Sequence, residues 1–277
     1  MKTPKVYTLW ILAGLALLLS ACGGAGPPAE PASEAGAEAP TVEAAVTVSA
    51  PEEGEAGEPA EVPASEGSPR AVTFVTADGV TLGGTLFGTG DTAIVLSHMF
   101  PTDQTSWHPF AQVAAEQGYL VLAYDFRGYG ASGGEQVIPD IDQDVRAAYD
   151  FVREQGAGRV VLIGASMGGT ASVKTAAALG DDVAGLVVLS SPEEFHGLEV
   201  TQAELDALSM PSLWMSARTD MVTPALEGMF EKAAGDKSLW IFEGSGAHGT
   251  FIFDAPLDGQ DLERRLLEFL SRVAPVS

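Results

Sequence analysis

The 277-residue chain carries 14 Lys and Arg against 38 Asp and Glu, which gives a formal net charge of −24. This balance argues against a nucleic-acid partner, because phosphate binding needs clustered basic side chains, and against electrostatic docking on anionic lipid. One Cys excludes an internal disulfide and a Cys-rich metal site, and four His leave little material for a His-rich one. We therefore expect an acidic globular domain, without metal or cofactor and acting as a monomer.

The first 21 residues are predicted to be an export signal. Lys2 and Lys5 precede an apolar run over Val6–Leu19, which is too short to span a bilayer as a helix and is typical of a secretory signal. The next residues, Leu-Ser-Ala-Cys22, resemble the lipobox of bacterial lipoproteins. This resemblance implies that Cys22 is lipidated and that the exported protein is anchored to a membrane, the outer membrane in a Gram-negative cell. An ordinary cleaved signal with an incidental Cys is the alternative.

Residues 22–70 are predicted to be a disordered, lipid-anchored linker. Within Gly23–Arg70 there are 12 Ala, 8 Pro and 10 Glu, and no aromatic residue, Leu, Ile or Met. Such a segment cannot bury enough apolar surface to offset its conformational entropy. We interpret it as a tether and expect the folded domain to extend over Ala71–Ser277.

The domain alternates strand-like and helix-like patterns, with a hairpin signal at Asp78-Gly79 between the first two strands. The strand-like runs are Val72–Thr76, Val80–Phe87, Thr92–Ser97, Leu120–Tyr124, Val160–Ile163, Leu186–Leu189, Ser212–Met215 and Ser238–Phe242. The helix-period segments are Trp107–Gln117, Ile141–Glu154, Met167–Leu179, Pro224–Ala233 and Leu262–Val273. This order predicts an α/β fold, with a mostly parallel eight-stranded sheet and helices on both faces.

The strongest motif is Gly164-Ala-Ser166-Met-Gly168, placed between a predicted strand and a predicted helix. In this context the glycines let the two backbones approach around a sharp turn. The serine is then held in a strained conformation, with its hydroxyl exposed at the carboxyl edge of the sheet. A small-residue turn with purely structural glycines is the alternative.

With this motif, Ala71–Ser277 resembles the α/β-hydrolase family, whose members carry a nucleophile after the fifth strand, then an acid, then a histidine. The resemblance implies that Ser166 is the nucleophile. It implies that His248, between the last strand and the last helix, is the catalytic base. The other histidines fit this role less well: His98 lies in the family's oxyanion-loop position, His108 opens a helix, and His196 lies in an irregular acidic segment.

The same resemblance implies that Asp220 is the acid, because the family commonly places its carboxylate in the loop before a Pro-led helix, here Pro224. Some members place the acid after the sixth strand instead, so Glu193 and Glu194 are the alternatives.

The oxyanion hole needs two backbone N–H groups, one from the residue after the nucleophile and one from the loop after the third strand. The first is Met167. The second loop, Ser-His-Met-Phe-Pro, is similar to the family's His-Gly-Phe-Pro, so Phe100 is expected to donate, with Met99 as the alternative. The later motif Asp125-Phe-Arg127-Gly-Tyr-Gly also resembles a family pattern, and we expect Arg127 to pair with a carboxylate.

The segment between the sixth and seventh strand-like runs is about twenty residues long, enough for one short helix but not for a lid domain. We therefore expect an open pocket for small or extended acyl substrates. Candidate apolar lining residues are Met99, Phe100, Trp107, Met167, Met221 and Phe251, of which about half are expected to be core.

These features predict a membrane-anchored serine hydrolase that cleaves carboxylic esters through an acyl-enzyme. A peptidase, a thioesterase, a C–C hydrolase or a cofactor-free oxidising relative would use the same three residues. A non-catalytic binding protein on the same fold is the remaining alternative.

Overall fold

The computed structural model describes residues 67–276. The predicted signal, Cys22 and almost all of the predicted linker lie outside the described residues. The strands of the main sheet are β1 (Arg70–Val75), β2 (Thr81–Phe87), β3 (Thr92–Ser97), β4 (Leu120–Tyr124), β5 (Arg159–Ala165), β6 (Gly185–Leu189), β9 (Ser212–Ala217) and β10 (Lys237–Phe242). The helices are α1 (His108–Glu116), α2 (Ile141–Glu154), α3 (Met167–Leu179), α4 (Gln202–Asp206), α5 (Thr223–Lys232) and α6 (Gly259–Val273).

The eight strands form one sheet in the order β1-β2-β4-β3-β5-β6-β9-β10. β2 pairs antiparallel with β1 and with β4, and every other neighbouring pair in this sheet is parallel. The predicted mostly parallel eight-stranded sheet is therefore confirmed. Because the chain steps from β3 out to β4 and back to β5, the sheet has a topological switch point between β3 and β5, where open α/β sheets bind ligands.

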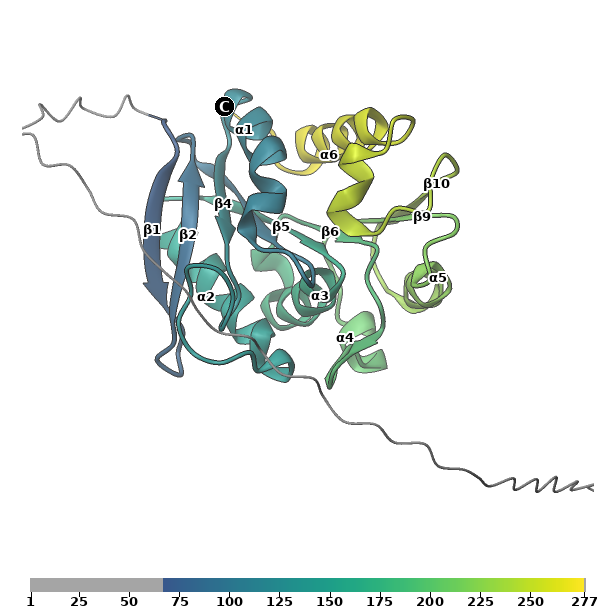
Figure 1. Cartoon of the computed structure of the whole chain (residues 1–277), viewed down its shortest axis with the longest axis horizontal. Helices are drawn as coiled ribbons and strands as arrows, with labels where there is room; N and C mark the ends of the chain where they lie inside the picture. The colour runs from purple at the N-terminus through teal and green to yellow at the C-terminus, as the bar shows by residue number, and fades with distance from the viewer. Residues whose placement is uncertain (1–66, 277) are drawn as a thin grey trace, which may run out of the picture. The chain divides into compact units, whose positions relative to one another are not determined.

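Each face of the sheet builds its own hydrophobic core, because successive side chains on a strand point to opposite faces. On β5, Val160 and Leu162 belong to one core, whereas Val161 and Ile163 belong to the other. Helices α1 and α6 cover the second face, and α2, α3 and α5 cover the first (Figure 1). Strands buried on both faces explain the continuous apolar runs in the sequence.

Three details differ from the sequence prediction. β1 begins at Arg70, one residue before the expected domain start at Ala71. The carbonyl of Gly67 also accepts a hydrogen bond from the N–H of Gly88 at 3.1 Å. A second, two-stranded sheet was not predicted; it consists of β7 (Glu194–Phe195) and β8 (Leu198–Glu199). Together with α4, this hairpin is all the regular structure between β6 and β9, so this segment contains no lid domain.

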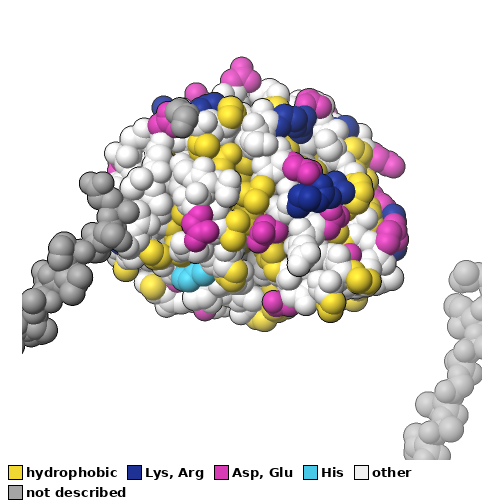
Figure 2. All heavy atoms as spheres, turned by 90° about the horizontal axis from the view of Figure 1, so that it is seen from above, with side chains coloured by type: hydrophobic (Ala, Val, Ile, Leu, Met, Phe, Trp, Pro, Cys, Tyr) yellow, Lys and Arg dark blue, Asp and Glu magenta, His cyan; other side chains and the backbone are white. Residues whose placement is uncertain are grey.

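The outer surface over α1 and α6 mixes acidic, basic and apolar side chains (Figure 2). Acidic and basic groups are interspersed there, as in the α6 pairs that join Arg264 and Arg265 to Asp261. Within residues 67–276, no helix has the length and apolar character needed to cross a membrane.

Candidate active site

The predicted site residues follow the carboxyl ends of four parallel strands. Ser166 follows β5, and the loop with Phe100 follows its neighbour β3, with Ser97 and Gly164 paired in register. Asp220 follows β9 and His248 follows β10, and these two strands are also paired. Because the carboxyl ends of parallel strands share one edge of a sheet, residues far apart in sequence meet there.

Ser166 sits in a strained turn between β5 and α3. Its φ is +51°, in the left-handed region that non-glycine residues rarely adopt, and its N–H donates to the carbonyl of Leu189 at 2.8 Å. The flanking glycines make the turn possible. A Cβ on Gly164 would lie 2.3 Å from the carbonyl oxygen of Gly168, and one on Gly169 would lie 1.9 Å from Oγ of Ser191. The close backbone approach predicted from the sequence is confirmed.

His248 and Asp220 form a direct contact, with Nδ1 2.8 Å from Oδ2. Because an ionised carboxylate can only accept, Nδ1 carries the proton and Nε2 is left as an acceptor. Asp220 is buried at 7% exposure, and its other oxygen accepts from the N–H of Val222 at 3.3 Å. This arrangement fixes both the tautomer and the orientation of the imidazole.

The alternative acids face other partners. Glu193 forms an ion pair with Lys232 at 3.0 Å, and Glu194 accepts a hydrogen bond from the N–H of Gly197 at 2.7 Å. The carboxylate that meets His248 in this structure is Asp220.

Ser166, Asp220, His248 and Phe100 line a single cavity of about 490 Å³. A hydrogen bond between the hydroxyl of Ser166 and the imidazole is absent from this structure, and such catalytic bonds often tighten only when substrate binds. The other residues of the lining are Pro192, Glu194, Phe195, Thr219, Met221, Val222 and Gly246.

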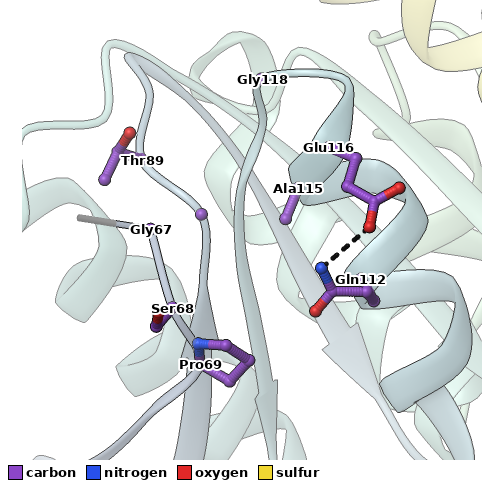
Figure 3. A pocket seen from close by; sticks show the side chains of 9 residues that line it. Gly67, Ser68, Pro69, Thr89, Gln112, Ala115, Glu116 and Gly118 are labelled. Atoms are coloured by element: carbon purple, nitrogen blue, oxygen red, sulfur yellow. Dashed lines mark hydrogen bonds between the residues drawn. The ribbon is translucent and has the colours of Figure 1, made fainter. Parts of the chain in front are cut away.

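Volume alone does not distinguish this cavity. A hollow of about 440 Å³ lies among residues 67–69, 88–89 and 112–118 (Figure 3). Its one titratable lining side chain is Glu116, which accepts from Nε2 of Gln112 at 3.1 Å. A third cavity, of about 450 Å³, is lined by residues of α2 and α3 and by residues 75–77 at the end of β1. Neither contains a nucleophile beside a histidine.

The two predicted oxyanion donors lie on either side of the switch point. Met167 is the first residue of α3, where leading N–H groups have no partner within the helix. Phe100 follows a carbonyl that is held firmly: Met99 C=O accepts from Nδ1 of His98 at 2.9 Å and from both the N–H and the hydroxyl of Thr102 at 3.0 Å. In a trans peptide the C=O and N–H point in opposite directions, so these bonds also fix the direction of the Phe100 N–H.

His98 is fully buried and acts as a connector between loops. Its Nε2 accepts from the N–H of Phe126 at 3.1 Å, while its Nδ1 donates to Met99. Burial lowers the pKa of this imidazole below its ordinary value, which agrees with a neutral ring that donates through one nitrogen and accepts through the other. The expectation that His98 serves the oxyanion loop rather than proton transfer fits this geometry.

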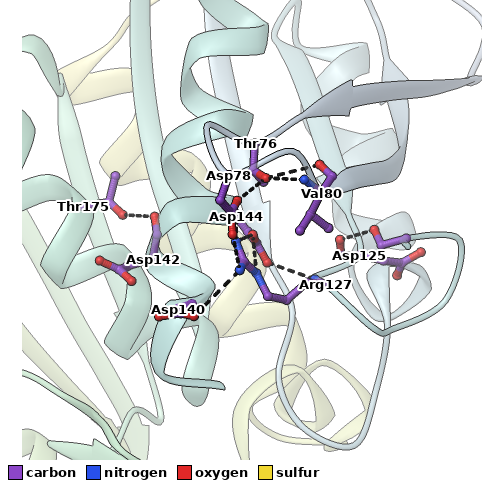
Figure 4. Close-up of polar contacts among 10 residues, drawn as sticks. Thr76, Asp78, Val80, Asp125, Arg127, Asp140, Asp142, Asp144 and Thr175 are labelled. Carbon is purple, nitrogen blue, oxygen red and sulfur yellow. Dashed lines mark hydrogen bonds and ion pairs between the residues drawn. The ribbon is translucent and has the colours of Figure 1, made fainter. Parts of the chain in front are cut away.

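Arg127 is confirmed as an ion-pairing residue, with three carboxylates around its guanidinium (Figure 4). The buried Asp144 accepts from its Nε at 2.9 Å and its Nη2 at 2.6 Å, and Asp78 accepts from Nη1 at 2.8 Å. Asp140 lies 4.0 Å away. Burial alone would lower the pKa of Arg127, but the bonds to Asp144 and Asp78 outweigh it and raise that pKa above its ordinary value. This cluster ties the turn after β4 to α2 and to the β1–β2 hairpin.

A row of buried hydroxyl groups beneath the Asp220 loop was not predicted. Thr223 Oγ1 donates to the carbonyl of Ala217 at 2.6 Å and lies 2.7 Å from Oγ of Ser216, which lies 3.4 Å from Oγ of Ser190. The N–H of Thr223 donates to the carbonyl of Asp220 at 3.1 Å. Serine and threonine at strand ends give no distinctive sequence pattern, so only the packing identifies this group.

The predicted lining residues divide between cavity and core. Phe100 and Met221 line the cavity and are exposed, at 48% and 94%. Met99, Trp107 and Met167 are fully buried core residues, which agrees with the expectation that about half of the six candidates are core. Phe251 is half exposed but lies outside the lining. Within residues 67–276, no group of three or more His, Cys, Asp or Glu is arranged to hold a metal ion.

Comparisons with known proteins show which families and relatives this chain is similar to. A family model described as serine aminopeptidase, S33, matches residues 89–195. The chain is 35% identical over 130 residues to the lipase LipV of Mycobacterium tuberculosis. This match covers 47% of this chain and 45% of that protein. It is 32% identical over 136 residues to the monoglyceride lipase of Homo sapiens. This match covers 46% of this chain and 45% of that protein. Epoxide hydrolase 3 of Xenopus tropicalis is 30% identical over 129 residues, and this match covers 45% of this chain and 33% of that protein. The chain thus spans less than half the length of these curated relatives.

Solved structures match over a longer stretch at lower identity. An esterase of Pyrococcus furiosus superposes with a TM-score of 0.65 at 19% identity, over 75% of this chain and 91% of that one. The α/β hydrolase GrgF of Penicillium superposes with a TM-score of 0.63 at 21% identity, over 74% of this chain and 99% of that one. The sheet order, the strained turn at Ser166 and these similarities show that the described residues adopt the α/β-hydrolase fold.

Proposed function

We propose that the domain is a serine hydrolase that cleaves carboxylic esters of small or extended acyl substrates. The observation that carries the proposal is the shared cavity of a strained, nearly buried Ser166 and an imidazole, His248, oriented by the buried Asp220. Positive φ also occurs at Ser190, so the strained backbone of Ser166 supports the proposal through its place in the cavity that His248 lines.

In the proposed reaction, Nε2 of His248 takes the proton of the Ser166 hydroxyl as Oγ attacks the acyl carbonyl carbon. The N–H groups of Met167 and Phe100 stabilise the negative oxygen that forms. The imidazolium returns its proton to the leaving alcohol, and the acyl group remains as an ester of Ser166. Water, deprotonated by His248, then attacks the carbonyl carbon of this ester. The bond from that carbon to Oγ breaks, the acid is released, and the imidazolium gives its proton to Oγ, which restores the serine.

The ester class is supported by the relatives, since two of those named above are lipases and one structural neighbour is an esterase. The open cavity of about 490 Å³, with apolar side chains and no covering domain, suits short or extended acyl groups. A peptidase is the second candidate, because the matching family model is that of a serine aminopeptidase.

Labelling with a fluorophosphonate probe tests the nucleophile. The wild-type protein should bind one probe per molecule, and Ser166→Ala should bind none while keeping its unfolding midpoint. Continued stoichiometric labelling of Ser166→Ala would contradict the assignment. A folded wild-type protein that is not labelled would instead support a non-catalytic binding role.

Matched esters, thioesters and amides of one acyl group then separate the candidate activities. We expect the highest kcat/KM for the ester at equal leaving-group reactivity. Faster cleavage of an unactivated amide than of its ester would favour the peptidase.

We also propose that the protein is exported and held to a membrane through lipid on Cys22, which lies outside the described residues. The proposal rests on the lipobox-like sequence and on the acidic composition, which disfavours attraction to anionic head groups. Wild-type protein should partition into a detergent phase, and Cys22→Ser should be released or left unprocessed. A Cys22→Ser protein that stays membrane-bound at high salt would overturn this proposal.

A further inference from the structure

The cavity that contains Ser166 and His248 is lined by acidic side chains and by no Lys or Arg. Its lining includes two carboxylates, Asp220 and Glu194, and no Lys or Arg. The carboxylate of Asp220 is engaged by His248, so Glu194 is the lining carboxylate without a titratable partner among the hydrogen bonds and ion pairs of the described chain. Five apolar residues complete the wall: Phe100, Pro192, Phe195, Met221 and Val222.

Basic side chains on the flanking segments do not offset this charge. Lys232 lies 3.0 Å from Glu193, and Arg218 lies 2.9 Å from Glu243 and 3.1 Å from Glu227. Each base is therefore matched by at least one acid of its own. We therefore expect a negative potential at the cavity, where the charge of Glu194 lies beside apolar side chains.

The position of Glu194 is set by the β7–β8 hairpin. The turn residues His196 and Gly197 have φ values of +50° and +88°, the combination of a tight two-residue hairpin turn. Oε1 of Glu194 accepts from the N–H of Gly197 at 2.7 Å, and Leu198 on the opposite strand is buried in the core. Glu194 is exposed, and this hydrogen bond holds its carboxylate at the edge of the cavity.

The same hairpin forms part of the cavity wall. The ring of Phe195 packs against that of Phe100, with centroids 5.9 Å apart. This contact joins the hairpin to the loop of the proposed oxyanion donor. In place of a lid domain, the structure has a short hairpin that presents one aromatic ring and one carboxylate to the cavity.

We propose that Glu194 is a specificity-determining residue that selects uncharged or cationic ester substrates and disfavours those with a carboxylate near the scissile bond. The inference rests on the proposed ester hydrolysis. A substrate anion would have to enter beside this carboxylate with no lining base to pair with it, and like charges a few ångströms apart repel each other even at a partly exposed site. A cationic group would gain from the same field.

The test uses three phenyl esters of equal length: hexanoate, monoadipate with a terminal carboxylate, and 5-(trimethylammonio)pentanoate. A second trio carries the same terminal groups on the alcohol. Wild-type kcat/KM should fall in the order cationic, neutral, anionic in at least one trio. The neutral-to-anionic ratio should be on the order of ten, as for unit charges roughly 6 Å apart in a partly hydrated site.

Glu194→Gln removes the charge but keeps an oxygen that can accept from Gly197. It should raise kcat/KM for the anionic ester about tenfold, change the neutral ester less than about twofold, and lower the cationic one. Glu194→Lys should reverse the order. Glu135→Gln, which changes the net charge equally on an exposed residue outside the cavity lining, should leave all ratios as in wild type.

Equal changes in all three esters for Glu194→Gln would overturn the inference, because the residue would then act only through the hairpin. Unchanged ratios would overturn it as well. In both cases the neutral ester is still cleaved, so the proposed function stands. A wild-type protein that cleaves no ester and takes no fluorophosphonate would overturn both.

Discussion

Nδ1 of His248 lies 2.8 Å from Oδ2 of Asp220, a contact that joins the loop after β10 to the loop after β9. Twenty-eight residues separate the two in the chain. They meet because β9 and β10 are neighbouring parallel strands whose ends share one edge of the sheet. The contact is the structural basis for the first prediction.

Asp220→Asn should lower kcat about 10⁴-fold, because an amide in this position favours the wrong imidazole tautomer. Glu193→Gln, which removes a carboxylate from an exposed ion pair with Lys232, should change kcat less than about twofold. Steady-state kinetics on a neutral phenyl ester provide the measurement. Near-wild-type activity of Asp220→Asn together with loss in Glu193→Gln would reverse the assignment of the acid.

Thr223→Val should lower kcat about tenfold with little change in KM, because the hydroxyl that fixes the loop of Asp220 to Ala217 is lost. Thr223→Ser keeps the hydroxyl and should restore most of the rate. Steady-state kinetics and urea unfolding provide the measurements. A hydroxyl that only stabilises the fold would lower the unfolding midpoint of Thr223→Val and leave its kcat unchanged.

Arg127→Met should cost about 3–5 kcal/mol of unfolding free energy, because the fully buried Asp144 would lose its charge partner. Arg146→Met is the matched control: Arg146 pairs with Asp150 on the exposed side of α2, and its loss should cost less than about 0.5 kcal/mol. Urea unfolding monitored by circular dichroism measures both. Equal costs for the two variants would show that the Arg127 cluster does not contribute more than a surface pair.

As the pH falls below about 6.5, the titration of His98 should lower the free energy of unfolding. Burial lowers the pKa of His98 in the folded protein, so the unfolded chain binds a proton first as the pH falls. The contribution is complete above the ordinary pKa and is lost by up to about 1.4 kcal/mol for each pH unit below it, until the folded pKa is reached. Urea unfolding at pH 7.5 and 5.5 should show a smaller pH effect in His98→Asn than in wild type. Equal pH effects would mean that His98 titrates as an exposed histidine.

Much of the fold was predictable because periodicity and turn chemistry are local. The runs Thr92–Ser97, Leu120–Tyr124, Ile141–Glu154 and Met167–Leu179 match the observed elements residue for residue. Strands buried on both faces are recognisable as continuous apolar runs, and the glycines around Ser166 are required by backbone contacts under 3 Å. The boundary at Arg70 was missed because a strand end has no sharp sequence signal.

The chain by itself determined the alternation of strands and helices, the strained serine turn, and the order of Ser166, Asp220 and His248, since each depends on residues close in sequence. Only the tertiary structure decided which acid meets the imidazole, because Asp220, Glu193 and Glu194 all follow strands that end at the same edge. It also decided that Met99 and Trp107 pack inward and that a hairpin of six residues presents Phe195 and Glu194 to the cavity. Such contacts join segments far apart in the chain, and their geometry depends on how the two cores pack against the sheet.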